Sequence, residues 1–238
     1  MNQYFSGWRC ILMVIALLPL CAESKTVLIT GANSGIGLEF ARQYAADGWQ
    51  VIATHRRDGI PRSLADLSTE FDNVQVESLD VTNHDSIDRL ATKLHGTPID
   101  VLLNNAGLVG ELTDPAQKFG SLDYALLERH LRTNTIGPLK MAEAFYDLVK
   151  ASDERKIVGI SSIAASLESA ARNEGATVGI SFRYAYNVSK AALNMAYVGL
   201  ANDSRRRERR LAASRAGAGR AYRGLFNDAA NGSADAGR

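Results

Sequence analysis

The sequence contains almost no cysteine. Cys10 and Cys21 are the two cysteines among its 238 residues, and both lie in one apolar stretch near the N-terminus. The rest of the chain therefore offers no disulfide, no thiolate nucleophile and no cysteine-ligated zinc. The four histidines show none of the close spacing that metal ligands have. We therefore expect no metal site.

An excess of charge of one sign is also lacking. Lys and Arg number 27 and Asp and Glu number 26, which leaves a net charge of +1. No global basic field indicates a nucleic-acid partner. Hydrophobic residues at 46% and charged residues at 22% exclude a disordered, fibrous or multi-span membrane protein. The length fits one domain with a sizeable core.

No hydrophobic run is long enough to span a bilayer. Residues 10–22 are apolar throughout, whereas a membrane helix needs ~20 such residues. Their length suits a signal peptide, but bulky Leu20 stands three places before the expected cleavage after Ala22. Export or membrane anchoring, a start codon placed too early and a buried extension all remain open for residues 1–24. We favour a cytoplasmic location.

Residues 202–238 lack both helical and strand periodicity. They hold nine Arg and four acidic residues, a charge of +5, against −4 for residues 1–201. Such a run can bind nucleic acid or phospholipid, but Arg, Ala and Gly bias without a period is typical of a disordered end. A shifted reading frame in GC-rich DNA is the other interpretation. We expect no nucleic-acid partner.

Between these ends, residues 25–201 alternate short apolar runs with helical patterns. Strands alternating with helices indicate parallel βαβ units, right-handed crossovers and a doubly wound α/β sheet in a single domain. Strands are predicted at residues 25–30, 49–55, 74–79, 99–104 and 156–161. Helices are predicted at residues 35–47, 61–71, 85–95, 134–151 and 184–201.

A glycine-rich turn, residues 30–37 (TGANSGIG), joins the first strand to the first helix. Glycine lets the backbone approach a pyrophosphate, and the helix N-terminus supplies free N–H groups. Arg56 and Arg57 end the second strand, and the first acidic residue there, Asp58, is already in the loop. An arginine at this place pairs with a 2′-phosphate, so NADP(H) is favoured over NAD(H). Two solvated surface arginines are the alternative.

Tyr186 and Lys190 stand four positions apart on one face of the last predicted helix. A lysine ammonium beside a phenol stabilises the phenolate. The tyrosine can then exchange a proton with a carbonyl/alcohol pair while a nicotinamide exchanges hydride. A Tyr-x-x-x-Lys spacing alone is common on surface helices.

The motifs together resemble the short-chain dehydrogenase/reductase family over about residues 25–201. Within that family, three sequence segments are similar to those of C-factor and sniffer-type carbonyl reductases (LITGANSGIGLEFARQ, DVLLNNAG, SKAALNMA). The resemblance implies a Rossmann-type sheet and a small carbonyl or alcohol substrate. It implies a homodimer or homotetramer in which copies of the chain contact each other through the two long helices. It implies cofactor binding by Gly31, Asn33, Ser34, Gly35, Ile36, Gly37, Arg56, Asp80, Val81, Asn105, Ala106, Gly107, Tyr186 and Lys190.

The same resemblance implies four catalytic residues. Tyr186 would be the acid/base, and Lys190 would grip the ribose hydroxyls and tune Tyr186. Ser162 would hold the substrate oxygen, and Asn134 would hold a water that links Lys190 to solvent. The alternatives are a turn serine for Ser162 and a buried cap for Asn134.

Two departures from the family pattern stand out. Ser162 and Tyr186 are 24 positions apart, about twice the family's gap, and the extra residues 165–183 could cover the substrate or pull Ser162 out of reach. No proline follows Pro138, and the usual last strands are lacking, so the fifth strand would keep an uncovered edge. We expect an NADP(H)-dependent carbonyl/alcohol oxidoreductase. The alternative is a non-catalytic dinucleotide-binding or signalling relative that has lost the C-terminal substrate region.

Overall fold

The computed structural model describes residues 24–111, 114–172 and 182–205. These residues form one sheet of five parallel strands in the order β3-β2-β1-β4-β5. The strands are β1 (Thr26–Ile29), β2 (Gln50–His55), β3 (Val74–Ser78), β4 (Val101–Asn104) and β5 (Lys156–Gly159). The predicted α/β, doubly wound parallel sheet is confirmed. The expectations for residues 1–23 and 206–238 lie outside the described residues.

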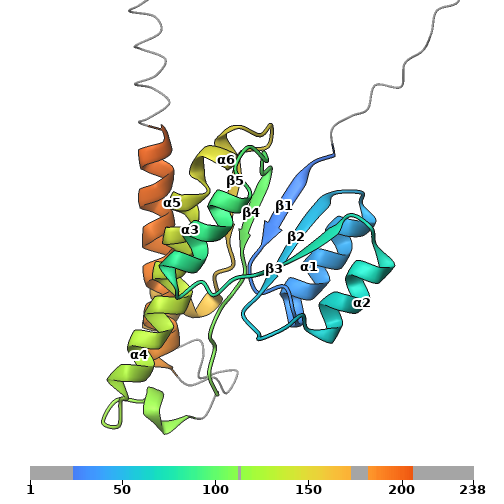
Figure 1. The fold of residues 1–238 in the computed structure, drawn as a ribbon. Coiled ribbons are helices and arrows are strands. Elements are labelled where there is room, and N and C mark those ends of the chain that lie inside the picture. The colour runs from blue at the N-terminus through green and yellow to red at the C-terminus, as the bar shows by residue number, and fades with distance from the viewer. Residues whose placement is uncertain (1–23, 112–113, 173–181, 206–238) are drawn as a thin grey trace, which may run out of the picture.

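Helices connect the strands and cover both faces of the sheet (Figure 1). The longer ones are α1 (Gly35–Ala46), α2 (Arg62–Glu70), α3 (His84–Lys93), α4 (Tyr124–Leu131), α5 (Gly137–Ala144) and residues 184–205. The short ones are α6 (Tyr146–Lys150), α7 (Leu167–Ala171), the 3₁₀ turns η1 (Pro115–Gln117) and η3 (Ile163–Ala165), and the π-helical segment η2 (Arg132–Ile136).

The core has two halves because side chains along each strand alternate between the faces of the sheet. On β1, Val27 and Ile29 pack with residues of α1 and α2. Leu28, between them, packs with residues of α3, α5 and α6. All three are fully buried, as parallel strands covered on both faces require. The central strands therefore hold their carboxyl ends in fixed positions.

The predicted helix at residues 134–151 was wrong in its start. The helical path begins at Tyr124, because the Asp123 side chain caps it by accepting from the backbone N–H groups of Ala125 and Leu126. Asn134 therefore lies inside a π-helical segment rather than at a helix start. The last helix also runs to residue 205, four residues beyond its predicted end and into the segment for which no period was expected.

The helix of residues 184–205 is fixed against the ends of β4 and β5. The Asn104 amide nitrogen donates to the Tyr197 hydroxyl at 2.9 Å, and burial raises the pKa of Tyr197 to about 12. A Cβ on Gly159 would lie 2.7 Å from the Tyr197 ring, so any other residue there would displace that ring. In the part of the chain that the structure describes, no strand pairs with the outer edge of β5, and Val158 is 36% exposed.

At the opposite end of the sheet, Glu154 joins β1 to β5. Its carboxylate accepts from Lys25 at 2.5 Å and from Lys156 at 2.6 Å. Asp100 supports the same corner by accepting from the backbone N–H groups of Thr26 and Glu154. Hydrogen bonds and charge from the two lysines lower the pKa of Glu154 from 4.5 to about 2.

Replacing Glu154 is expected to make the free energy of unfolding depend less on pH in the acidic range. A carboxyl group with a depressed pKa stabilises the fold above its ordinary value of 4.5, and that stability is lost as the pH falls through about 2. Urea unfolding should show the wild type more stable than Glu154→Gln at pH 6, with the difference vanishing toward pH 2. Exposed Glu39→Gln is the control. A difference that stays constant with pH would contradict the assignment.

Candidate functional site

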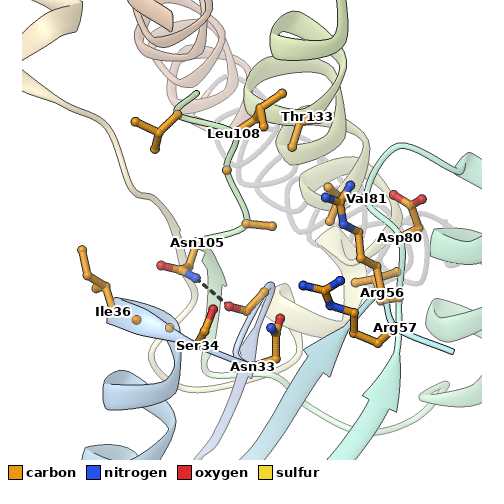
Figure 2. Close-up of a pocket in the computed structure, with 17 residues that line it drawn as sticks. Asn33, Ser34, Ile36, Arg56, Arg57, Asp80, Val81, Asn105, Leu108 and Thr133 are labelled. Carbon is orange, nitrogen blue, oxygen red and sulfur yellow. Dashed lines mark hydrogen bonds between the residues drawn. The ribbon is translucent and has the colours of Figure 1, made fainter. Parts of the chain in front are cut away.

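A cleft of about 450 Å³ opens at the carboxyl ends of the strands (Figure 2). It lies where the chain order reverses between β1 and β4, the place at which open α/β sheets bind ligands. Twelve of the fourteen residues predicted to bind a cofactor line it, and these are Gly31, Asn33, Ser34, Gly35, Ile36, Gly37, Arg56, Asp80, Val81, Asn105, Ala106 and Gly107. Arg57, which the sequence places beside Arg56, lines it as well, and so do four residues that were not predicted: Leu79, Leu108, Val109 and Thr133.

The floor of the cleft is the contact between the glycine-rich turn and the loop after β4. The Asn105 amide nitrogen donates to the backbone oxygens of Thr30 at 3.0 Å and Gly31 at 3.1 Å. The Thr30 hydroxyl oxygen accepts from the backbone N–H groups of Asn105 and Ala106, each at 3.0 Å. A Cβ on Gly37 would lie 2.3 Å from the Asn105 amide nitrogen and 2.5 Å from the Gly31 oxygen. Glycine is therefore required by space alone at residue 37.

Positive charge gathers at the end of β2. Figure 2 shows Arg56 and Arg57 extending from the end of β2, one guanidinium toward Asn33 and the other toward Val81. Within residues 24–111, 114–172 and 182–205 neither arginine forms an ion pair. His55 adds no charge, because burial lowers its pKa, and its Nδ1 accepts from the Arg57 backbone N–H. The arrangement can hold an anion without displacing a carboxylate.

Tyr186 and Lys190 form a second, buried centre at the start of the last helix. Tyr186 is 8% exposed and Lys190 is 5% exposed. The Lys190 Nζ donates to the Ile160 backbone oxygen at 2.7 Å and lies 5.9 Å from the Tyr186 ring centroid. Burial lowers the pKa of Lys190. The Tyr186 hydroxyl makes no hydrogen bond to the described residues, so it is available to a substrate.

Asn134 connects the cleft to this second centre. Its Oδ1 accepts from the Leu108 backbone N–H at 2.7 Å, and its Nδ2 donates to the Leu108 oxygen at 2.8 Å and to the Ser189 hydroxyl at 2.9 Å. A Cβ on Gly107 would lie 3.5 Å from the Asn134 Oδ1 and 3.7 Å from the Lys190 Nζ. These are the contacts of a buried cap, the alternative role for Asn134. Wider π-helical turns such as η2 occur often at functional sites.

Ser162 forms its hydrogen bond with a local turn rather than with another predicted catalytic residue. It follows β5, and its hydroxyl oxygen accepts from the Ala164 backbone N–H at 3.2 Å and caps η3. No hydrogen bond among the described residues joins it to Asn134, Tyr186 or Lys190. Much of the long segment before Tyr186, residues 173–181, lies outside the described residues.

Two residues that the sequence reading missed contact Tyr186. Gln117 is fully buried, and its Oε1 accepts from the Tyr186 backbone N–H at 3.3 Å. The Arg183 guanidinium lies over the Tyr186 ring, with its Cζ 4.6 Å from the ring centroid. No sequence signal marks Gln117, which is 69 positions away along the chain. Arg183 stands three positions before Tyr186, so the sequence indicates that the two residues are close. It does not indicate that the guanidinium lies over the ring.

The described residues contain no group of three His, Cys, Asp or Glu side chains placed to hold a metal ion. None of the helices in those residues has the length and apolar character to cross a membrane.

The fold and the place of its cleft are those of a Rossmann-type domain, and comparison with known proteins gives the family. The family model for short chain dehydrogenases matches residues 25–218. The chain belongs to the short-chain dehydrogenase family. It is 34% identical over 158 residues to (+)-neomenthol dehydrogenase from Arabidopsis thaliana. The aligned region covers 58% of this chain and 53% of that protein. The chain thus spans about half the length of several curated relatives.

Solved structures agree with this assignment. Carbonyl reductase Sniffer of D. melanogaster has a TM-score of 0.64 at 29% identity, covering 76% of this chain and 75% of that one. A carbonyl reductase from Pseudomonas aeruginosa PAO1 in complex with NADP has a TM-score of 0.63 at 30% identity, covering 76% and 74%. The fold of this chain is therefore that of carbonyl reductases of the family.

Replacing Gly37 tests the close contact in the floor of the cleft. Gly37→Ala is expected to lower the free energy of unfolding by about 1–3 kcal/mol, because the new methyl group overlaps a backbone oxygen. Gly199→Ala is the matched control, since a Cβ there meets nothing within 4 Å and alanine favours a helix by about 1 kcal/mol. Urea unfolding measures both. Equal stabilities of the two variants would contradict the contact.

Proposed function

We propose that this chain is an NADP(H)-dependent oxidoreductase that interconverts a carbonyl and an alcohol by hydride transfer, with Tyr186 as the acid/base. The observation that carries the proposal is one connected set of residues. The glycine-rich cleft and the buried pair of Tyr186 and Lys190 meet around Gly107 at the same edge of the sheet. The NADP complex of the P. aeruginosa carbonyl reductase supports the choice of cofactor.

The residues lining the cleft fit a nicotinamide dinucleotide. The turn from Gly31 to Gly37 would hold the pyrophosphate, because it brings backbone N–H groups of the α1 N-terminus to an open surface. Arg56 and Arg57 would hold the 2′-phosphate, for which their unpaired charges suit them. Residues 80–81 would line the adenine side and residues 105–107 the ribose. When bound, the cofactor supplies or accepts the hydride.

The protein's part in the reaction is to move one proton and hold charge. In reduction, the Tyr186 hydroxyl gives its proton to the substrate oxygen, and in oxidation the phenolate takes that proton. The Lys190 ammonium, held by Ile160, stabilises the negative charge on the phenol oxygen. Because burial lowers the pKa of Lys190, this help ends at a lower pH than for an exposed lysine. Ser162 is proposed to hold the substrate oxygen, and Asn134 to fix the loop after β4.

Removing the Tyr186 hydroxyl tests the acid/base role. Tyr186→Phe is expected to lower kcat by about 100-fold or more, the ordinary size of general acid catalysis. Loss of NADPH absorbance over a panel of aldehydes and ketones measures the rate. Fluorescence of bound NADPH should show affinity within about threefold of the wild type, which separates chemistry from binding. A variant that turns over at the wild-type rate would exclude Tyr186 as the acid/base.

Replacing the arginines tests the cofactor preference. Arg56→Gln with Arg57→Gln is expected to weaken NADPH binding by about 10- to 100-fold, the value of charged hydrogen bonds. NADH lacks the 2′-phosphate, so its affinity should stay unchanged. Titration calorimetry measures both, with Arg62→Gln as the control because that side chain is 93% exposed on α2. Equal losses of affinity for NADPH and NADH would exclude the two arginines as the binding site of the 2′-phosphate.

A non-catalytic dinucleotide-binding or signalling protein is the second candidate function. The local partner of Ser162 favours it, because no hydrogen bond among the described residues joins the Ser162 hydroxyl to Tyr186 or Lys190. In that case NADPH would bind with no turnover by the wild type over the whole panel. Any Tyr186-dependent turnover decides for the enzyme.

We also propose a homodimer or homotetramer formed through α5 and residues 184–205. Leu139 on α5 is 44% exposed, and Met195 and Val198 on the last helix are 72% and 57% exposed. A second copy of the chain would cover these apolar side chains. A single domain over residues 25–201, a small carbonyl or alcohol substrate and a cytoplasmic location complete the proposal.

A further inference from the structure

Arg183 is a buried cation with few partners. The residue is 6% exposed, and the Nε of its side chain makes no hydrogen bond. The guanidinium donates one long hydrogen bond, 3.4 Å, to the Val109 backbone oxygen. No carboxylate among the described residues pairs with it. Its main contact is the face of the Tyr186 ring, 4.6 Å from the Cζ to the centroid.

Such burial is unfavourable for a guanidinium unless an anion or several hydrogen bonds replace the lost water. One long hydrogen bond does not replace it. The face of an aromatic ring attracts a cation, and more strongly once both are removed from water. A phenolate ring carries a full negative charge that a phenol ring lacks. Arg183 therefore gains most when Tyr186 is ionised, and by reciprocity the ionised form of Tyr186 gains from Arg183.

We propose that Arg183 is a positioning residue for Tyr186, which holds the ring by its face and stabilises the ionised phenol. The inference rests on the proposed function, in which Tyr186 exchanges a proton with the substrate. Arg183 acts through the ring and does not need to touch the substrate. Val109 ties its guanidinium to the loop after β4, as Ile160 ties Lys190 to the end of β5.

Few charged groups compete at this place. Lys190 lies 5.9 Å from the ring centroid, on the same helix as Tyr186. From η1 the contact is Gln117, which is neutral and meets the Tyr186 backbone rather than the ring. From α4, His130 is fully buried beside Gly110, with Nδ1 against the Leu126 oxygen. Tyr186 is thus contacted by two cations and, within the described residues, by no carboxylate that pairs with either.

A guanidinium could instead bind an anionic group of the substrate. The burial of Arg183 favours the phenol, because its Nε is closed to solvent and the residue as a whole is nearly so. The position of its Cζ over the ring also brings the guanidinium against Tyr186. An anionic substrate is therefore kept as an outcome of the test.

The first test needs no turnover. The full chain is labelled at the Cζ carbon of its eight tyrosines with ¹³C, and the Tyr186 resonance is assigned from its absence in Tyr186→Phe. The midpoint of its pH titration is expected to rise by about one pH unit in Arg183→Gln, a shift that a desolvated cation–π contact can supply. Arg183→Lys should restore part of the shift. An unchanged midpoint in Arg183→Gln overturns the proposal.

Two variants guard this measurement. Arg62→Gln removes the same charge from an exposed side chain and should leave the midpoint in place. Arg183→Met fills a similar volume and leaves no polar atom unsatisfied, so it replaces Arg183→Gln if that variant does not fold. A rise that is equal in Arg62→Gln would also overturn the proposal, because the effect would then be one of net charge.

The second test separates the phenol from the substrate. NADP⁺-dependent oxidation is followed with paired alcohols, one neutral and one bearing a carboxylate. Arg183→Gln is expected to lower kcat by up to about tenfold for both at a pH below the Tyr186 midpoint, with KM unchanged, because oxidation uses the phenolate and a one-unit rise of the midpoint lowers the phenolate fraction about tenfold. A loss confined to the carboxylate-bearing compound, with a raised KM, overturns the proposal. Absence of turnover by the wild type would count against the proposed function alone, since the titration still decides the role of Arg183.

Discussion

The contact between the glycine-rich turn and the loop after β4 is the constraint on which the rest of the site depends. No side chain fits at Gly37, because the Asn105 amide occupies that space and bonds two backbone oxygens of the turn. The contact locks the floor of the cleft to two central strands. It also fixes where the chain leaves β4, and the loop that leaves there reaches the second centre.

Three successive residues of that loop contact the side chains of the second centre. Gly107 lies against Asn134 and Lys190, and the Asn134 amide holds both backbone groups of Leu108. Val109 accepts the hydrogen bond of Arg183. The same few residues therefore line the cofactor cleft and hold the helix that bears Tyr186. Under the proposed function, a shift in this loop would change cofactor binding and proton transfer together.

Local patterns in the sequence predicted the strands and the cleft, because apolar runs and glycine spacing are local and parallel strands bring their carboxyl ends to one edge. The start of the helical path at Tyr124 was missed, since its signal is a single capping residue, Asp123. Gln117 and the contacts of Asn134 depend on which loops meet in the fold. Such tertiary contacts leave no periodic trace. Ser162 was assigned by its motif alone, and its observed partner is a local turn.

A crystal structure of the full chain grown with NADP⁺ tests the central claim most directly. We predict the pyrophosphate over the turn from Gly31 to Gly37, the 2′-phosphate between Arg56 and Arg57, and the nicotinamide facing the hydroxyl of Tyr186. Cofactor density at another place, or a cleft that stays empty at saturating NADP⁺, would contradict the account.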